Sequence, residues 1–248
     1  MKIGVAYNIW DGDEHLPESL HWVRQFADYV VGVYSNVSNS SELYEPTIPL
    51  GFNRLIEYLP NQSLTRHQNE LAKRNIGYKA CMDADCTLFM TIDCDEIYDP
   101  YQLMRVAVRM QRDGYDASAC QMQTYYGDKF HQYLEPERYY VPLLYKVWQG
   151  REFKEYTQWP VLADPTRKFA SNNVLVLSRE ECEMHHYSYV RNDIARKLRN
   201  SSAYPNVQRT MEESIKYYNS WKHPMPAFVM GTLVALRQVE NPYVLPQS

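Results

Sequence analysis

Hydrophobic and polar positions at the start of the chain alternate between the spacings of strands and those of helices. Residues 2–8 place apolar side chains at every second position, which predicts a buried strand. Residues 16–29 place them three and four positions apart, as an amphipathic helix does, and the apolar run 29–34 predicts a second strand. This order of strand, helix and strand predicts parallel strands joined by a right-handed crossover.

Regular elements are expected to continue as far as residue 126. Residues 35–63 are rich in Ser, Asn, Pro and Gly, which predicts a long loop. Residues 69–82 predict a helix, and the apolar run 88–92 that follows predicts a buried strand. A further amphipathic helix is expected over 100–113, and a strand is expected over 116–126.

Residues 127–180 differ from the preceding part because they are rich in aromatic rings and interrupted by prolines. Short strands are expected at 143–147 and 174–177. A region with so many rings and so little regular backbone is typical of a binding surface, so we expect an acceptor substrate to lie here. A basic helix is expected next, over 192–203.

The C-terminal part of the chain predicts two more helices, near 209–221 and over 227–237. The apolar side chains of the second could rest on a membrane, but packing against the domain explains them as well. We therefore expect one domain over 1–203, with a first half at 1–100 and a second half at 101–203, and a C-terminal helical extension over 204–248.

Composition places the chain among globular proteins. Its 248 residues are 45% hydrophobic and 23% charged, which suits one domain with an appendage. A net charge of -4 does not indicate an extended nucleic-acid surface. Five cysteines without zinc-ligand spacing predict reduced thiols and a cytoplasmic protein. The N-terminus is expected to be a strand rather than a signal peptide, and no run is long enough for a membrane span.

An acidic cluster directly after the run 88–92 is the strongest chemical signal in the sequence. Asp93, Asp95 and Glu96 repel one another, so they point to a positive ligand such as a divalent cation bound to nucleotide phosphates. Oxygen ligands of this kind suit Mg2+ or Mn2+ rather than zinc. The alternative is a solvated acidic turn that caps the next helix, with Asp99 as its N-cap before Pro100.

Two motifs together resemble a known family. An Arg-Asn-x-Gly-x-x-Ala segment begins at Arg74 and precedes the Asp-x-Asp-Glu that begins at Asp93. A His-x-Ser-x-Val-Arg segment runs from His186 to Arg191. This combination resembles family-2-like glycosyltransferases with a GT-A fold, over most of residues 1–203. The resemblance implies an α/β fold, GT-A-like and Rossmann-like, with a mixed, mainly parallel sheet flanked by helices.

The resemblance also implies a metal site. Asp95 is expected to coordinate Mn2+ or Mg2+ that bridges the nucleotide diphosphate, and Asp93 is expected to face the ribose or the water shell of the metal. Because an Asp-x-Asp does not complete an octahedral shell, a later ligand is expected, and the family resemblance favours His186 over its neighbour His185. The alternative for the two histidines is a pair held by backbone hydrogen bonds.

Basic residues provide candidate ligands for the donor phosphates. Arg191 and Lys197 are expected to bind phosphate oxygens alongside the metal. Arg74 is a further candidate, although an ion pair on a helix face would also explain it.

The catalytic base is less well defined by sequence. An inverting transferase needs a carboxylate or imidazole within about 3 Å of the acceptor hydroxyl. We expect Asp128, at the end of the strand 116–126, or His185 in this role; a retaining enzyme would need neither. Other candidates in the second half are Glu135, Glu155, Asp164 and Glu183.

The predicted function is metal-dependent transfer of a sugar from a nucleotide-diphosphate sugar to a hydroxyl of a glycan, a protein, a small molecule or a modified nucleotide. One alternative is a non-catalytic module that binds a nucleotide sugar. Another is a metal-dependent nucleotidyltransferase, which would release pyrophosphate instead of a nucleoside diphosphate.

Overall fold

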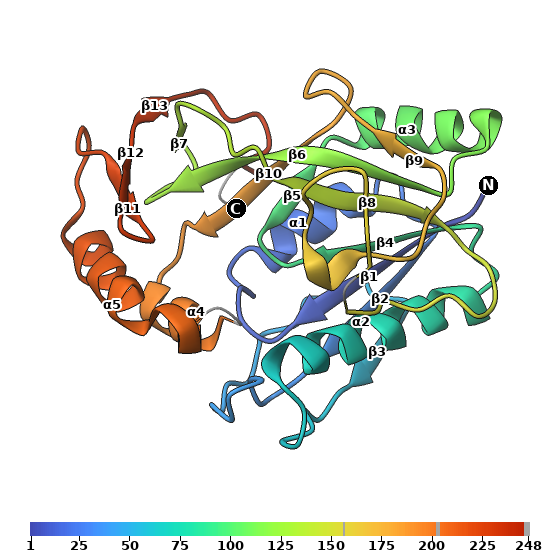
Figure 1. The fold of residues 1–248 in the computed structure, drawn as a ribbon, viewed down its shortest axis with the longest axis horizontal. Coiled ribbons are helices and arrows are strands. Elements are labelled where there is room, and N and C mark those ends of the chain that lie inside the picture. The colour runs from blue at the N-terminus through green and yellow to red at the C-terminus, as the bar shows by residue number, and fades with distance from the viewer. Residues whose placement is uncertain (156, 202–203, 246–248) are drawn as a thin grey trace.

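The computed structural model describes residues 1–155, 157–201 and 204–245, and its backbone forms a mixed sheet with helices on both faces (Figure 1). The strands are β1 (Ile3–Ile9), β2 (Tyr29–Tyr34), β3 (Arg54–Glu57), β4 (Leu88–Asp93), β5 (Glu96–Tyr98), β6 (Ala117–Tyr126), β7 (His131–Tyr133), β8 (Tyr140–Lys146), β9 (Val174–Val176), β10 (Glu183–Tyr189), β11 (Ala227–Val229), β12 (Thr232–Val234) and β13 (Leu236–Gln238). The helices are α1 (Leu16–Val23), α2 (Arg66–Asp83), α3 (Pro100–Asp113), α4 (Ile194–Asn200) and α5 (Tyr204–Ser220), with a short 3-10 helix η1 (Pro165–Arg167).

The sheet order is β13-β7-β6-β8-β4-β1-β2-β3, with β5, β9 and β10 attached beside this path. Strand β1 pairs in parallel with β2 and with β4, which confirms the strand-helix-strand unit predicted at the N-terminus. Strand β8 is antiparallel to both β4 and β6, so the sheet is mixed. Because β8 reverses direction, it begins at the edge of the sheet where β4 ends.

The two faces of the central strands bury different helices. Val5 and Met90 pack with the apolar side chains of α1 and α3, whereas Ala6 and Phe89 pack with those of α2. Successive residues of β1 and β4 therefore face opposite layers, and both strands are buried from each side. This explains why the predicted strand 88–92 is a continuous apolar run rather than an alternating one.

Gly77 in α2 allows the helix to lie unusually close to β1. A Cβ atom at this position would be 2.5 Å from the Cβ of Ala6, which is closer than real Cβ atoms approach one another. The glycine of the Arg-Asn-x-Gly motif is therefore required by packing. The close contact also brings Lys73 and Arg74, one turn earlier in the helix, next to the ends of β1 and β4.

Local sequence determines where the flanking helices begin. The Thr65 hydroxyl accepts a hydrogen bond from the Gln68 amide at 3.1 Å, and the Gln68 side chain accepts one from the Thr65 amide at 3.0 Å, which forms a capping box at the start of α2. Asp99 caps α3 by accepting a bond from the Gln102 amide at 2.8 Å, as predicted. This cap involves Asp99 alone, so it leaves Asp93 and Asp95 free for another role.

The C-terminal part differs from the prediction. The helix expected near 209–221 is present as α5, but the helix expected over 227–237 is wrong, because this segment forms β11, β12 and β13. Met230 and Gly231 have φ values of 50° and 83°, and two consecutive residues with positive φ favour a tight hairpin turn over a helix. The domain boundary expected at residue 203 lies outside the described residues. Among the helices described, none combines the length and apolar composition that a membrane span requires.

Candidate functional site

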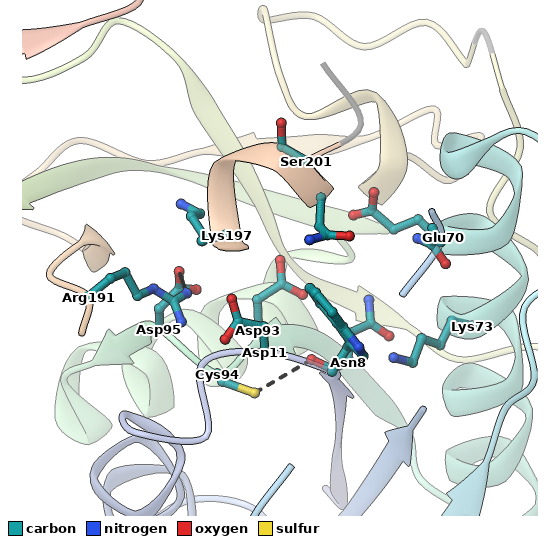
Figure 2. A pocket seen from close by; sticks show the side chains of 13 residues that line it. Asn8, Asp11, Glu70, Lys73, Asp93, Cys94, Asp95, Arg191, Lys197 and Ser201 are labelled. Carbon is teal, nitrogen blue, oxygen red and sulfur yellow. Dashed lines mark hydrogen bonds and ion pairs between the residues drawn. The ribbon is translucent and has the colours of Figure 1, made fainter. Parts of the chain in front are cut away.

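A cavity of about 220 Å³ opens where β1 and β4 end (Figure 2). The two strands are parallel and Asn8 pairs with Asp93, so both end at one edge of the sheet. This is where ligands bind in open α/β sheets. Four residues that the sequence predicted for the site line the cavity together, namely Asp93, Asp95, Arg191 and Lys197.

Asp95 is buried and surrounded by positive or polarisable groups. Its Oδ2 lies 2.5 Å from Nη2 of Arg191 and 3.9 Å from Nε2 of His186. Burial alone would raise the pKa of the carboxyl, but Arg191, His186 and Lys197 hold it well below its ordinary value. Asp95 is therefore ionised at neutral pH, as a metal ligand must be.

Asp93 is held by two arginines that lie behind it. Its Oδ2 is 2.6 Å from Nη2 of Arg167 and 3.3 Å from Nη2 of Arg74, and these charges lower the pKa of Asp93 against the effect of burial. Arg74 is completely buried, and it also donates hydrogen bonds to Thr91 and Glu70. The structure thus places Arg74 against the back of Asp93 rather than among the residues that line the cavity.

Arg167 is a site residue that the sequence did not reveal. It lies on η1, contacts both carboxylate oxygens of Glu96, and makes a further ion pair with Asp164 at 3.2 Å. The Asp-Pro pair at 164–165 is a recognisable helix start, so the turn itself could have been predicted. Nothing local in the sequence links this turn to Asp93, which lies 74 positions earlier.

Two buried lysines face the cavity. Lys73 donates from Nζ to the Ile9 carbonyl at 2.7 Å, and Lys197 donates to the Ser188 carbonyl at 2.9 Å. Burial lowers the pKa of each to about 8, although nearby acidic groups oppose the effect. Both side chains are therefore mostly charged at neutral pH and can bind an anion.

The end of β1 and the loop that follows it place polar groups without partners in the cavity lining. Asn8 Nδ2, Trp10 Nε1 and Asp11 Oδ2 are buried and find no hydrogen-bond partner within the part of the chain that the structure describes. Two of these atoms are donors and one is an acceptor. Because buried polar groups are nearly always paired, they indicate a ligand or water with complementary groups here.

The two residues predicted as catalytic bases lie outside the cavity lining. Asp128 is about half exposed and accepts hydrogen bonds from the His131 ring and from the Phe130 amide, each at 2.8 Å. His185 bonds through Nδ1 to the Tyr125 hydroxyl at 2.9 Å. His185 and His186 are successive residues of β10, so their side chains point to opposite sides of the sheet.

The residues present fit a divalent cation that is shared with a substrate. Among residues 1–155, 157–201 and 204–245, no group of three or more His, Cys, Asp or Glu side chains is arranged to hold a metal by itself. Asp95 and His186 together offer one ionised oxygen ligand and one imidazole, whose pKa burial lowers to about 4, so that it is neutral. Mg2+ and similar ions are commonly bound by one or two protein ligands, with substrate phosphates and water completing the shell.

Comparison with models of protein families and with curated protein sequences found no match. The structure of residues 1–349 of S. aureus TarS matches with 15% identity and a TM-score of 0.50, over 88% of this chain and 72% of that chain. The same protein in complex with UDP matches with 14% identity and a TM-score of 0.48, over 90% and 73% of the two chains. Its complex with UDP-GlcNAc matches with 14% identity and a TM-score of 0.47, over 88% and 73%.

At this level of identity, the similarity concerns the fold. TarS has a GT-A-type fold, and the similarity extends over most of the present chain. The fold predicted from the sequence motifs is thereby confirmed: the chain has a GT-A-like α/β architecture with helices on both faces of a mixed sheet.

Proposed function

We propose that this chain is a metal-dependent glycosyltransferase that moves a sugar from a nucleotide-diphosphate sugar to a hydroxyl acceptor. The observation on which this depends is the charge arrangement in one cavity. Two ionised carboxylates, Asp93 and Asp95, lie among the cationic side chains of Lys73, Arg191 and Lys197. A GT-A-like fold with this arrangement at the ends of its parallel strands suits a diphosphate bound together with a cation.

The cations of the chain would bind the diphosphate and stabilise it as it leaves. Charge develops on the diphosphate when its bond to the sugar breaks, so fixed positive groups nearby lower the barrier. Arg191 and the two lysines are buried and held by Asp95, Ile9 and Ser188, so they need little rearrangement to act. Arg167 and Arg74 keep Asp93 oriented from behind.

Asp95 and His186 would hold the divalent cation. When bound, Mn2+ or Mg2+ supplies Lewis-acid stabilisation of the departing diphosphate. Oδ1 of Asp95 accepts no hydrogen bond from the described residues, whereas Oδ2 is bound by Arg191. One carboxylate oxygen is therefore available for a cation without breaking the ion pair.

The loop after β1 would receive the nucleoside. Asn8 and Trp10 offer donors to carbonyl oxygens of a base or to ribose oxygens, and Asp11 offers an acceptor to an N–H or hydroxyl group. The Trp10 ring contacts Tyr44 edge to face, so aromatic rings lie beside these polar atoms.

The test is calorimetric titration of the wild type and of Asp95→Asn with a panel of nucleotide sugars, each with and without Mn2+. The wild type is expected to bind one donor in an Mn2+-dependent manner and to release its nucleoside diphosphate, and Asp95→Asn is expected to lose both. Wild-type turnover by Asp95→Asn would contradict the metal assignment. Release of pyrophosphate instead would contradict glycosyl transfer.

A further inference from the structure

The segment between β7 and β8, residues 134–139, leads into β8 at the edge of the sheet where β4 ends. Glu137 lies three residues before Tyr140, where β8 begins, and is therefore near this edge of the sheet. The carbonyl of Tyr140, the first residue of β8, accepts a hydrogen bond from the Asp164 amide at 3.2 Å. Asp164 starts the turn that contains Arg167, and Arg167 in turn binds Asp93. The segment is thus joined to the same structure that positions the acidic cluster.

Glu137 is held in place from two sides. Its Oε1 accepts a hydrogen bond from the Thr124 hydroxyl at 2.8 Å, and its backbone carbonyl accepts one from Nη2 of Arg179 at 2.9 Å. Thr124 on β6 is the register partner of His186 on β10, so the two side chains lie next to each other on one face of the sheet. Thr124 therefore links the Glu137 carboxylate to the face of the sheet on which His186 lies.

The charge of the Glu137 carboxylate acts on three tyrosines. Burial raises the pKa of Tyr133, Tyr139 and Tyr189, and the negative charge of Glu137 contributes to the increase in each of them. The Tyr133 hydroxyl is also buried without a hydrogen-bond partner in the described part of the chain. Rings with hydroxyl groups near a carboxylate match a sugar-like or other hydroxyl-bearing acceptor, because they combine apolar contact with hydrogen bonding.

The other carboxylates near the sequence-predicted acceptor region are already engaged or lie elsewhere. Asp164 accepts bonds from Thr166 and Arg167, and Glu183 is bound by Arg179. Glu155 lines a separate cavity of about 500 Å³ that Asp93 and Asp95 do not line. Glu137 Oε2, in contrast, accepts no hydrogen bond from residues that the structure describes.

We infer that Glu137 is the general base that activates the acceptor, a role that rests on the transferase function proposed above. Glu137 Oε2 removes the proton of the acceptor hydroxyl, and the freed oxygen lone pair forms the bond to the anomeric carbon of the donor. The bond between that carbon and the diphosphate oxygen breaks, and its electrons leave with the nucleoside diphosphate. The configuration at the anomeric carbon is inverted, and the proton passes from Glu137 to water.

The matched variants are Glu137→Gln and Glu135→Gln, which remove one carboxylate each from the same segment. Nucleoside diphosphate release is measured with the donor found by titration, using water and a panel of sugar alcohols as acceptors. Glu137→Gln is expected to lower kcat about 10²–10⁴-fold, the usual contribution of a general base, and to leave donor affinity within about twofold. Glu135, which is exposed, is expected to have no effect when changed to Gln.

Three results would overturn the assignment. The first is a Glu137→Gln variant that keeps the wild-type kcat while binding donor normally, which would leave the transferase function intact. The second is retention of configuration in the product, measured by nuclear magnetic resonance, because a retaining reaction does not use such a base. The third is donor binding without any turnover by the wild type, which overturns the transferase function itself and this role with it.

A structural role for Glu137 predicts a different outcome. If the residue only supported the fold, Glu137→Gln would lower the melting temperature and Thr124→Val would do the same. A general base that Thr124 orients predicts that kcat falls by far more than any loss of melting temperature explains, and that Thr124→Val lowers kcat by a smaller factor than Glu137→Gln. Loss of donor affinity in step with loss of melting temperature would overturn the catalytic role.

Discussion

Arg191 binds Asp95 across 2.5 Å, from Nη2 to Oδ2, and both side chains are almost completely buried. Gly12 makes room for this arginine, because a Cβ atom there would lie 2.5 Å from Nη1 of Arg191. The ion pair therefore joins the loop after β1, the end of β4 and the segment after β10. It also keeps a positive charge, which is proposed to bind the diphosphate, beside the carboxylate that is proposed to bind the cation.

Replacing Arg191 should reveal how strongly Asp95 depends on it. Arg191→Met keeps the volume but leaves a buried carboxylate without its partner, so the free energy of unfolding should fall by about 3–5 kcal/mol. Urea denaturation measures this loss, and Asp95→Asn in the same chain should restore part of it. Mn2+ should stabilise Arg191→Met more than the wild type, because the cation can replace the lost charge. A loss below about 1 kcal/mol would show that solvent reaches Asp95.

Replacing Arg167 should also lower the free energy of unfolding, because Arg167 pairs with Asp93 and Glu96. These partners lie far from it in sequence. Arg167→Met leaves Glu96 buried and unpaired, so a loss of about 3–5 kcal/mol in unfolding free energy is expected. The control is Lys79→Met, which removes an exposed ion pair with Asp83 and should cost about 0–1 kcal/mol. Equal losses in the two variants would contradict a structural role for the Arg167 network.

The sequence allowed the central part of the fold and the acidic cluster to be predicted, because both are encoded locally. The apolar run of β4 and the carboxylates that follow it are neighbours in the chain, so one pattern predicts both. Arg191 and Lys197 were found only through the family resemblance, and the structure brings them to the same cavity. Their placement depends on β10 pairing beside β6, which no local pattern reveals.

Contacts between distant segments account for what the sequence did not reveal. Arg167 belongs to an irregular segment, and its role follows only once that segment folds over Asp93. Glu137 is likewise recognisable only through Thr124 and the pairing of β6 with β10. The C-terminal hairpin was predicted as a helix because its apolar residues fit both periods; backbone angles at Met230 and Gly231 decide between them.

Replacing Gly77 with a larger residue should destabilise the packing of α2 against β1. Gly77→Ala places a Cβ atom 2.5 Å from that of Ala6, so α2 must move away from the strand. Overpacking of this kind costs about 1–3 kcal/mol in unfolding free energy, measured by urea denaturation. The double variant Gly77→Ala with Ala6→Gly should recover most of the loss, because it restores the space. Failure of this second change to rescue stability would show that the contact between α2 and β1 is not the cause.

Lys73 should make nucleotide binding sensitive to pH. Burial lowers its pKa to about 8, so the ammonium form, which binds phosphate, is present below this pH and is lost above it. Affinity for the nucleoside diphosphate of the donor found by titration, measured by calorimetry between about pH 7 and 9.5, should therefore fall as the pH rises through the pKa region of the lysine. Bound diphosphate favours the charged form, so the midpoint should lie at or above that value.

The variant Lys73→Met isolates this contribution. A hydrogen bond to a charged group is worth about 1.5–3 kcal/mol, so affinity for this nucleoside diphosphate at pH 7 should fall about 10–150-fold. In the wild type, two lysines with pKa values lowered to about 8, Lys73 and Lys197, contribute to the pH dependence of binding. Only Lys197 titrates in the variant, so affinity should fall less steeply with rising pH. Lys79→Met, on the exposed face of the same helix, should bind the nucleoside diphosphate as the wild type does. An unchanged pH dependence in Lys73→Met would place the phosphates away from this end of the cavity.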